Sequence, residues 1–149
     1  MQRFIVLILV VCAMTACQSN NDRDNLAQTR DAYSRNLAKW GDANIHDYQF
    51  IYNTYCFCAM LQNVVIVVQQ DKVTSAFYQA SGEYLPDNQL AGLPTIDSLF
   101  NTIEDAINRN AYKLTASYND DYGYPTEVSI DYEKNTIDEE FGFSASNLM

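Results

Sequence analysis

Residues 95–107 read TIDSLFNTIEDAI, and this stretch decides the fold. Its apolar residues recur three and four positions apart, so they line one side of a helix while polar residues occupy the other side. These apolar residues are Ile96, Leu99, Phe100, Ile103, Ala106 and Ile107. Thr95 is a natural N-cap, and Asp97 in the first turn suits the helix dipole. The stretch therefore predicts an amphipathic helix that packs its apolar side against a core.

Three segments with strand patterns precede this helix, at residues 44–55, 64–68 and 72–79. The first alternates, which places four residues on one face: Tyr48, Phe50, Tyr52 and Thr54. The second is apolar on both faces, as in a strand buried on both sides or at the centre of a sheet. Gln70 and Asp71 fit a tight hairpin turn without the usual glycine. Residues 81–94, which contain two Gly and two Pro, predict a loop.

A further helix and three further strands complete the predicted fold. Apolar residues at helical spacing mark the helix upstream: Leu26, Tyr33, Leu37 and Trp40. Gly41 is well placed to end it. After the central helix, residues 112–118, 126–132 and 137–143 alternate between apolar and polar side chains, as in an antiparallel meander under a helix.

The predicted class is α+β, with two helices packed on an antiparallel sheet of about six strands. The order of elements is α-β-β-β-α-β-β-β. Two halves of similar length suggest a duplicated α-β₃ unit, although the halves share almost no sequence identity.

The first seventeen residues have the order of a secretory signal. Arg3 gives a basic start, residues 4–13 are apolar, and Met14-Thr15-Ala16-Cys17 follows. The apolar run is too short to span a bilayer, which requires roughly 20 residues. The last four residues resemble a bacterial lipobox, in which the cysteine becomes the acylated first residue. We therefore predict a signal peptide at 1–16, a lipidated tether at 17–24 and a single domain at 25–149.

Charge limits the partners of the mature chain. Removal of residues 1–16 would leave 133 residues with a net charge of −11, since Arg3 is the single charged residue removed. This acidic balance argues against nucleic acid and against electrostatic adhesion to anionic lipid. The membrane is therefore expected as a partner through the lipid on Cys17. By resemblance to lipoproteins of Gram-negative bacteria, Gln18 after this cysteine implies the outer membrane, with the domain facing the periplasm.

Two thiols remain in the predicted mature domain, at Cys56 and Cys58. An exported protein meets an oxidising environment, which favours a small local disulfide at the turn after the first strand. Two alternatives stay open. One is a reduced or metal-binding pair, although zinc normally takes four ligands. The other is a redox pair, which lacks the Cys-x-x-Cys spacing that lowers a thiol pKa.

Other candidate sites are weaker. His46 is the single histidine and lies in a loop before a strand, where a solvated side chain is the simpler interpretation. The acidic residues near 119–123 lack the ligand order of a calcium loop, so we expect a solvated turn. The exposed tyrosines suit a contact surface, for which Tyr122-Gly123-Tyr124-Pro125 is the best candidate, although a structural turn is the favoured interpretation. We identify no catalytic residues, no metal ligands and no cofactor.

Several segments together resemble an uncharacterised family of bacterial lipoproteins, domain of unknown function 6174. They are Trp40, residues 47–52, Cys56-Phe57-Cys58, residues 64–68, residues 95–100, and residues 118–125 leading to Ile130-Asp131. The resemblance covers about residues 37–143, and the Tyr-Gly-Tyr-Pro turn is its most specific part. The chain departs from the family pattern at Asp71-Lys72, where a glycine is expected in the hairpin turn. The family implies no activity, substrate or catalytic residue.

The sequence therefore favours a non-enzymatic, lipid-anchored protein of the cell envelope. Its expected role is an interaction or scaffold module that contacts another envelope protein. The alternative is a thiol, metal-binding or redox protein that uses Cys56 and Cys58.

The lipid anchor yields the first testable prediction. Cys17→Ser should abolish lipidation and leave an uncleaved or soluble form, because the mature sequence has no other apolar membrane segment. Fractionation with metabolic labelling by a fatty acid measures this outcome. A variant that stays in the membrane fraction with unchanged migration would show that Cys17 is not the anchor.

Overall fold

The structure is a computed structural model that describes residues 18–56, 61–134, 136 and 140–149. Its elements, in chain order, are α1 (Gln18–Ala43), β1 (Tyr48–Tyr55), β2 (Val64–Gln69), β3 (Lys72–Tyr78), α2 (Asp87–Leu90), α3 (Ile96–Asn108), β4 (Lys113–Tyr118), β5 (Pro125–Asp131) and β6 (Phe141–Ser146). The predicted α+β class and the order of its main elements are confirmed. A four-residue helix, α2, lies within the segment predicted as a loop.

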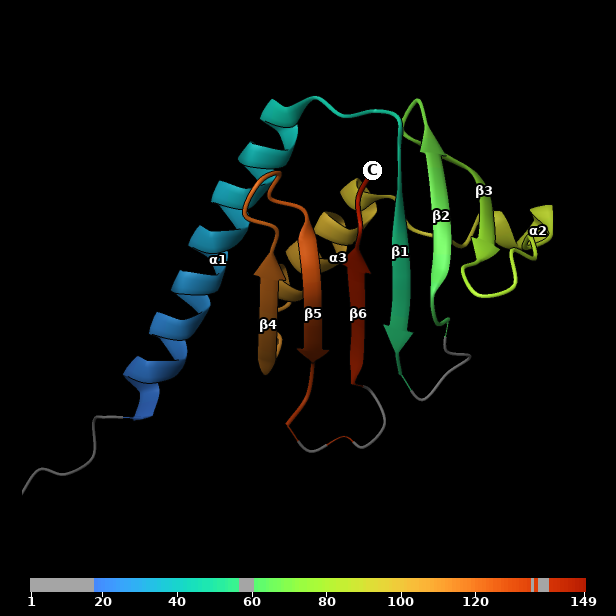
Figure 1. Cartoon of the computed structure of the whole chain (residues 1–149). Coiled ribbons are helices and arrows are strands. Elements are labelled where there is room, and N and C mark those ends of the chain that lie inside the picture. Colours follow the sequence, from blue (N-terminus) through green and yellow to red (C-terminus); the bar gives the residue numbers. More distant parts are fainter. Residues whose placement is uncertain (1–17, 57–60, 135, 137–139) are drawn as a thin grey trace, which may run out of the picture.

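The six strands form one antiparallel sheet in the order β3-β2-β1-β6-β5-β4 (Figure 1). Its centre is the pair of β1 and β6, in which Thr54 lies opposite Phe143. The order gives the two halves of the chain different places, since β1 is central and β4 is at an edge. Within each half the strands keep the same order, β3-β2-β1 and β6-β5-β4, and the suggested duplication itself stays a prediction.

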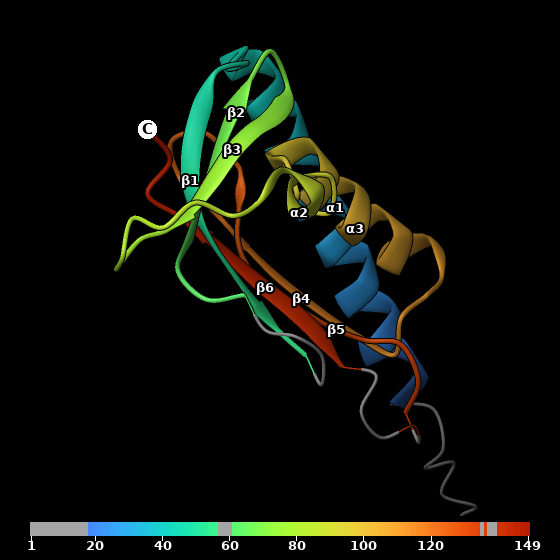
Figure 2. The ribbon, with the colours of Figure 1, turned by 90° about the vertical axis from the view of Figure 1, so that its right-hand side faces the viewer.

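The helices lie on one face of the sheet, and the hydrophobic core fills the space between the two layers (Figure 2). Strand alternation sends every second side chain into this core. In β1 the four residues that the sequence places on one face are all buried, with Phe50 1% and Thr54 8% exposed. The largest fully buried side chains of the core are Phe50, Phe100, Phe143, Ile66, Ile96, Leu99, Ile103 and Ile130.

Helix α3 confirms the pattern from which the fold was predicted. All six apolar residues of its stripe are buried. Thr95 is the N-cap, and its Oγ1 accepts a hydrogen bond from the backbone N of Ser98 at 3.2 Å. The phenol oxygen of Tyr48, in β1, accepts from the backbone N of Ile96 at 3.0 Å, which satisfies another amide of the first turn.

Helix α1 differs from its prediction at both ends. It begins at Gln18, so residues 18–24, predicted as a tether, are helical. It also continues through Gly41 to Ala43, and Asn44 follows with a φ of 51°, the left-handed conformation that often ends helices. Among the described residues no helix combines the length and the hydropathy needed to cross a bilayer.

The apolar side of α1 is narrower than predicted. Tyr33 and Trp40, two turns apart, are buried at 8% and 4% exposure, whereas Leu37 is 37% exposed.

Strand β6 also differs from its prediction, since it runs to Ser146 instead of ending at residue 143. Residues 137–139 of the predicted segment lie outside the described residues. The predicted tight turn at Gln70 and Asp71 is present between β2 and β3.

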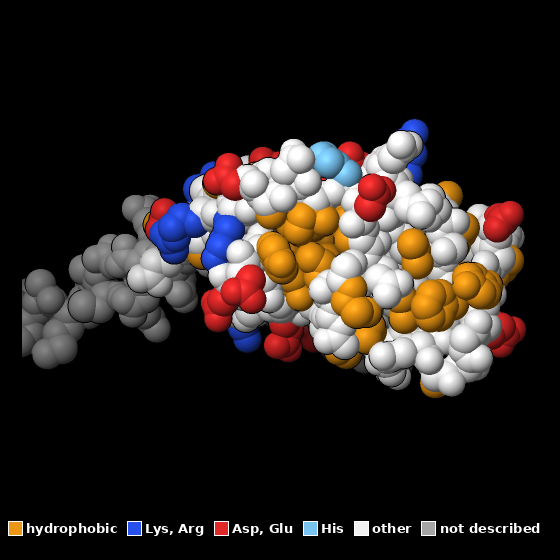
Figure 3. Space-filling model, turned by 45° about the horizontal axis from the view of Figure 1, so that its top comes forward, with side chains coloured by type: hydrophobic (Ala, Val, Ile, Leu, Met, Phe, Trp, Pro, Cys, Tyr) orange, Lys and Arg blue, Asp and Glu red, His pale blue; other side chains and the backbone are white. Residues whose placement is uncertain are grey.

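The face of the sheet away from the helices is called here the open face. Within the described residues no helix covers it (Figure 2). Figure 3 looks obliquely onto this side and shows hydrophobic side chains among uncharged surface, with charged side chains mainly around them.

The stripe of α3 yields a stability prediction. Phe100 is 1% exposed and its ring lies 6.0 Å from that of Tyr33 and 6.2 Å from that of Tyr118. Phe100→Ala should therefore lower the free energy of unfolding by about 3–5 kcal/mol. Asn101→Ala, on the exposed side, should change it by less than about 0.5 kcal/mol. Chemical denaturation measures both, and equal effects at the two positions would contradict the helix-on-sheet packing.

Candidate functional site

The predicted lipidation site and disulfide fall partly outside the described residues. Cys17 and Cys58 are both outside them. Cys56 directly follows β1 and is half-buried. Lipidation at Cys17 and the pairing of Cys56 with Cys58 therefore stay predictions.

The Tyr122–Pro125 segment lies in the turn between β4 and β5. Asn119 builds this turn, because its side-chain oxygen accepts hydrogen bonds from the backbone N of Asp121 at 3.0 Å and of Tyr122 at 2.8 Å. Its backbone oxygen accepts from the N of Gly123 at 3.0 Å. Three of the four predicted contact residues are buried, and only the side chain of Tyr122 is exposed, at 44%. A role for this segment as a contact surface stays a prediction that rests on Tyr122.

The buried part of the turn packs on α1. Gly123 has a φ of 79°, and a Cβ atom there would lie 2.6 Å from the backbone oxygen of Asn36 and 3.0 Å from Cβ of Lys39. The ammonium of Lys39 donates a hydrogen bond to the backbone oxygen of Asp120. Only glycine permits this approach of the turn to the helix. The close contact explains why Gly123 and Tyr124 are buried.

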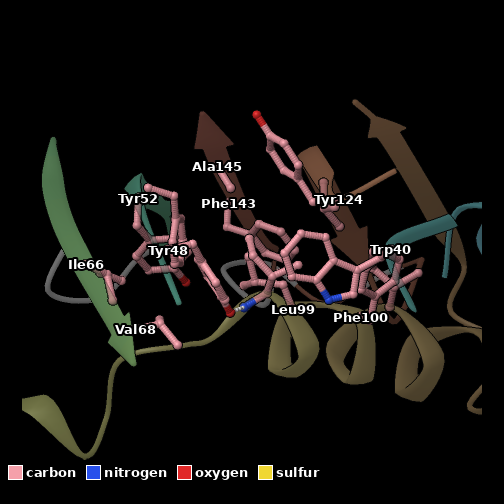
Figure 4. Packing of buried hydrophobic residues seen from close by; sticks show 14 of the residues in the cluster. Trp40, Tyr48, Tyr52, Ile66, Val68, Leu99, Phe100, Tyr124, Phe143 and Ala145 are labelled. Atoms are coloured by element: carbon pink, nitrogen blue, oxygen red, sulfur yellow. Dashed lines mark hydrogen bonds between the residues drawn. The ribbon is translucent and has the colours of Figure 1, made fainter. Parts of the chain in front are cut away.

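Trp40, in α1, contacts β1, α3 and the β4–β5 turn, and Figure 4 shows its ring among the buried side chains of the core. Its ring meets Tyr48 of β1 edge-to-face at 5.5 Å, and Tyr124 of the β4–β5 turn at 6.5 Å. Its indole N–H donates to Oδ1 of Asp97, in the first turn of α3, at 3.2 Å. Burial raises the pKa of Tyr48 to about 12, so the phenol that bonds the N-terminus of α3 stays protonated at neutral pH. This junction is structural, because every contact named here joins elements of the fold.

His46 is exposed, as the sequence predicts for a loop histidine, and it has a partner that the sequence did not indicate. Its Nδ1 lies 2.9 Å from Oδ1 of Asp71, in the β2–β3 turn. Asp120 and Asp121 are exposed in the β4–β5 turn. In the part of the chain that the structure describes, no three His, Cys, Asp or Glu side chains form a group able to hold a metal ion.

Sequence reasoning missed an apolar cluster on the open face, made of Ile51, Val65, Val67, Phe77 and Tyr84. Ile51 lies opposite Val65 in the β1–β2 register, and Val65 lies opposite Phe77 in the β2–β3 register. Ile51 and Val65 are only 8% and 7% exposed but belong to no part of the main core. The chain after β3 turns back so that the Tyr84 ring lies 5.4 Å from that of Phe77.

The open-face cluster lies in an uncharged region. The outward residues of the three neighbouring strands β6, β1 and β2 are Gly142, Ser144, Ser146, Gln49, Ile51, Asn53, Tyr55, Val65, Val67 and Gln69. None of them is charged, in a chain with a net charge of −10. The available signal was the run of residues 64–68, apolar on both faces, which places apolar side chains on both sides of β2.

The close approach of the β4–β5 turn to α1 can be tested with two glycines. Gly82 has a φ of 69° and open space where a Cβ would be, so Gly82→Ala should cost only the strain of the left-handed backbone, about 1–2 kcal/mol. Gly123→Ala has the same strain and must also displace the Asn36 carbonyl, which adds roughly 1–3 kcal/mol. Thermal and urea unfolding compare the two variants. A Gly123→Ala protein as stable as Gly82→Ala would contradict the packing of the turn on α1.

The comparisons with known proteins give one match. Residues 32–149 match a family of unknown function, DUF6174, which agrees with the resemblance noted in the sequence. The searches of curated proteins and of solved structures each gave no match to this chain. The match begins within α1 and includes all six strands and the Trp40 junction. This chain therefore belongs to the DUF6174 family.

Proposed function

We propose that this protein is a lipid-anchored interaction module of the cell envelope that binds another envelope protein through the open face of its sheet. The observation that carries this proposal is the open-face cluster, which lies outside the main core and combines the buried Ile51 and Val65 with the exposed Tyr84.

The composition of the open face supports a protein partner. The centres of protein–protein interfaces are depleted in charged residues and enriched in aromatic ones. The central strands of the open face have no charged residue facing outward. Two tyrosines of this face are exposed: Tyr84, a member of the cluster, at 66%, and Tyr55, outside it, at 50%. Tyrosine provides a large apolar contact with a polar hydroxyl, which suits a surface that is exposed to solvent before binding and buried after it.

The charge of the whole chain supports a partner with basic residues at its edges. The 19 Asp and Glu exceed the 9 Lys and Arg, while the centre of the open face is neutral. A partner with an apolar centre and a basic rim would match both features. A second copy of this chain would bring two acidic rims together, which disfavours self-association at this face.

The predicted lipid anchor supports the same proposal, because it would concentrate the domain at the membrane surface. The signal pattern that ends at Cys17 favours export and acylation, and acylation would confine the domain to the membrane surface. Confinement raises the effective concentration of the domain relative to other envelope proteins, so a modest contact suffices for binding. Gln18 after the cysteine favours the outer membrane, with the domain in the periplasm.

Site-specific photocrosslinking in the native envelope tests the proposal. A photoreactive phenylalanine replaces Tyr55 or Tyr84 on the open face, and Tyr112 serves as the control. Tyr112 is 53% exposed but shares the strand face of Leu114, which packs against the core. We expect the same partner protein, identified by mass spectrometry, at positions 55 and 84 and not at 112. Cys17→Ser should abolish these crosslinks.

A substitution then measures how much the open face contributes to binding of the partner. Tyr84→Asp should reduce the crosslink at position 55 by about tenfold, equivalent to roughly 1.4 kcal/mol of binding free energy. Tyr112→Asp should leave it unchanged. Crosslinks to a second copy of the chain, or equal crosslinks at position 112, would contradict the proposal.

A further inference from the structure

The turn between β2 and β3 has a backbone conformation that its residues rarely adopt. Gln70 and Asp71 have φ values of 50° and 62°. Two consecutive positive φ values are typical of a type I′ hairpin turn, in which Asn-Gly is the preferred pair. For Gln70 this conformation costs roughly 1–2 kcal/mol, whereas Asp71 tolerates it better because its short polar side chain can hydrogen-bond locally. Contacts from outside the hairpin help to hold this turn.

Those contacts come from the segment that precedes β1. The backbone N of Gln70 donates a hydrogen bond to Oδ1 of Asp47 at 2.8 Å. The backbone N of Asp71 donates to the backbone oxygen of His46 at 3.1 Å. The Nδ1 of His46 lies 2.9 and 3.0 Å from the two carboxylate oxygens of Asp71. Both turn residues are thus held, and only the last contact depends on the protonation of His46.

The surroundings of His46 match its doubly protonated form. Nδ1 faces the carboxylate of Asp71, and Nε2 lies 3.4 Å from the side-chain oxygen of Asn44. Both ring nitrogens therefore face an acceptor. A neutral imidazole has one N–H and can donate to only one of them, whereas the imidazolium donates to both.

We propose that His46 is a pH-dependent clamp, which in its protonated form holds the strained β2–β3 turn against the segment before β1 and which loosens when it loses a proton. The two backbone amide contacts keep the segments adjacent in both states. Loss of the proton removes the charge on the ring and one of its two hydrogen bonds. The clamp acts on edge strand β3, which contributes Phe77 to the open-face cluster.

The electrostatic environment sets the direction of the pH dependence. The hydrogen bond from His46 to Asp71 raises the pKa of His46 above its ordinary value of 6.5, and the charges of Asp71, Asp47 and Asp97 act in the same direction. Partial desolvation opposes them. Because the folded-state pKa is raised, the contribution of the clamp is complete below pH 6.5 and is lost as the pH rises through the folded-state value.

Nuclear magnetic resonance of the full chain in detergent micelles tests the proposal directly, since His46 is the single histidine. Asp71→Asn removes the carboxylate but keeps a residue that tolerates positive φ. Glu83→Gln is the matched control, because Glu83 is exposed and its charge does not act on His46. We expect a pKa of His46 above 6.5 in the wild type and in Glu83→Gln, and a value closer to 6.5 in Asp71→Asn.

Amide hydrogen exchange then tests whether loss of the proton from His46 destabilises the β2–β3 turn. The protection factors of the Gln70 and Asp71 amides should fall in the wild type as the pH rises through the measured pKa of His46. In His46→Asn, which has no ring to titrate, they should show no step over the same range. A wild-type pKa at or below 6.5, or protection factors without a step in the wild type, would overturn the proposal.

Discussion

The buried indole of Trp40 is the contact on which the arrangement of the helices depends. Among the side chains of α1 that the structure describes, from residue 27 on, Tyr33 and Trp40 are buried, and Trp40 contacts α3, β1 and the β4–β5 turn together. Its N–H donates to Asp97, so burial of the indole leaves no unsatisfied donor, which would otherwise cost about 1–3 kcal/mol. Because Tyr48 bonds the same first turn of α3, both the helix and the central strand are fixed at one end of the core.

Both long helices lie on one face of the sheet, so the opposite face is left exposed to solvent or to a partner. An antiparallel sheet can expose one face to water if that face carries polar residues. The half of the open face formed by β4, β5 and β6 follows this rule, with Thr115, Ser129 and Ser144 facing outward. The half formed by β1, β2 and β3 does not, because the open-face cluster occupies it. This division within one sheet is the physical reason to look for a partner at β1–β3 rather than at β4–β6.

Much of the fold could be predicted because its local patterns and its packing agree. The stripe from Ile96 to Ile107 faces the core in full, and β1 buries the face that its alternation marks. The pairing of β1 with β6 could not be predicted, since alternation defines the face of a strand and not its neighbour. The end of α1 was misplaced because Gly41 and Asn44 are both suited to stop a helix, and only the backbone of Asn44 adopts the left-handed conformation.

The candidate site shows a sharper limit of sequence reasoning. Tyr122-Gly123-Tyr124-Pro125 has the composition of a contact surface and of a packed turn alike. The two are separated by the packing of Gly123 on α1, where a Cβ atom would lie 2.6 Å from the backbone oxygen of Asn36. Asp71 shows the reverse case. Where a glycine is usual in the β2–β3 turn, the chain has an aspartate at positive φ that provides a carboxylate to His46. A glycine at this position would stabilise the hairpin by itself but would leave no charge for the histidine. The departure from the usual turn residue therefore exchanges local backbone stability for a contact between distant segments that responds to protons.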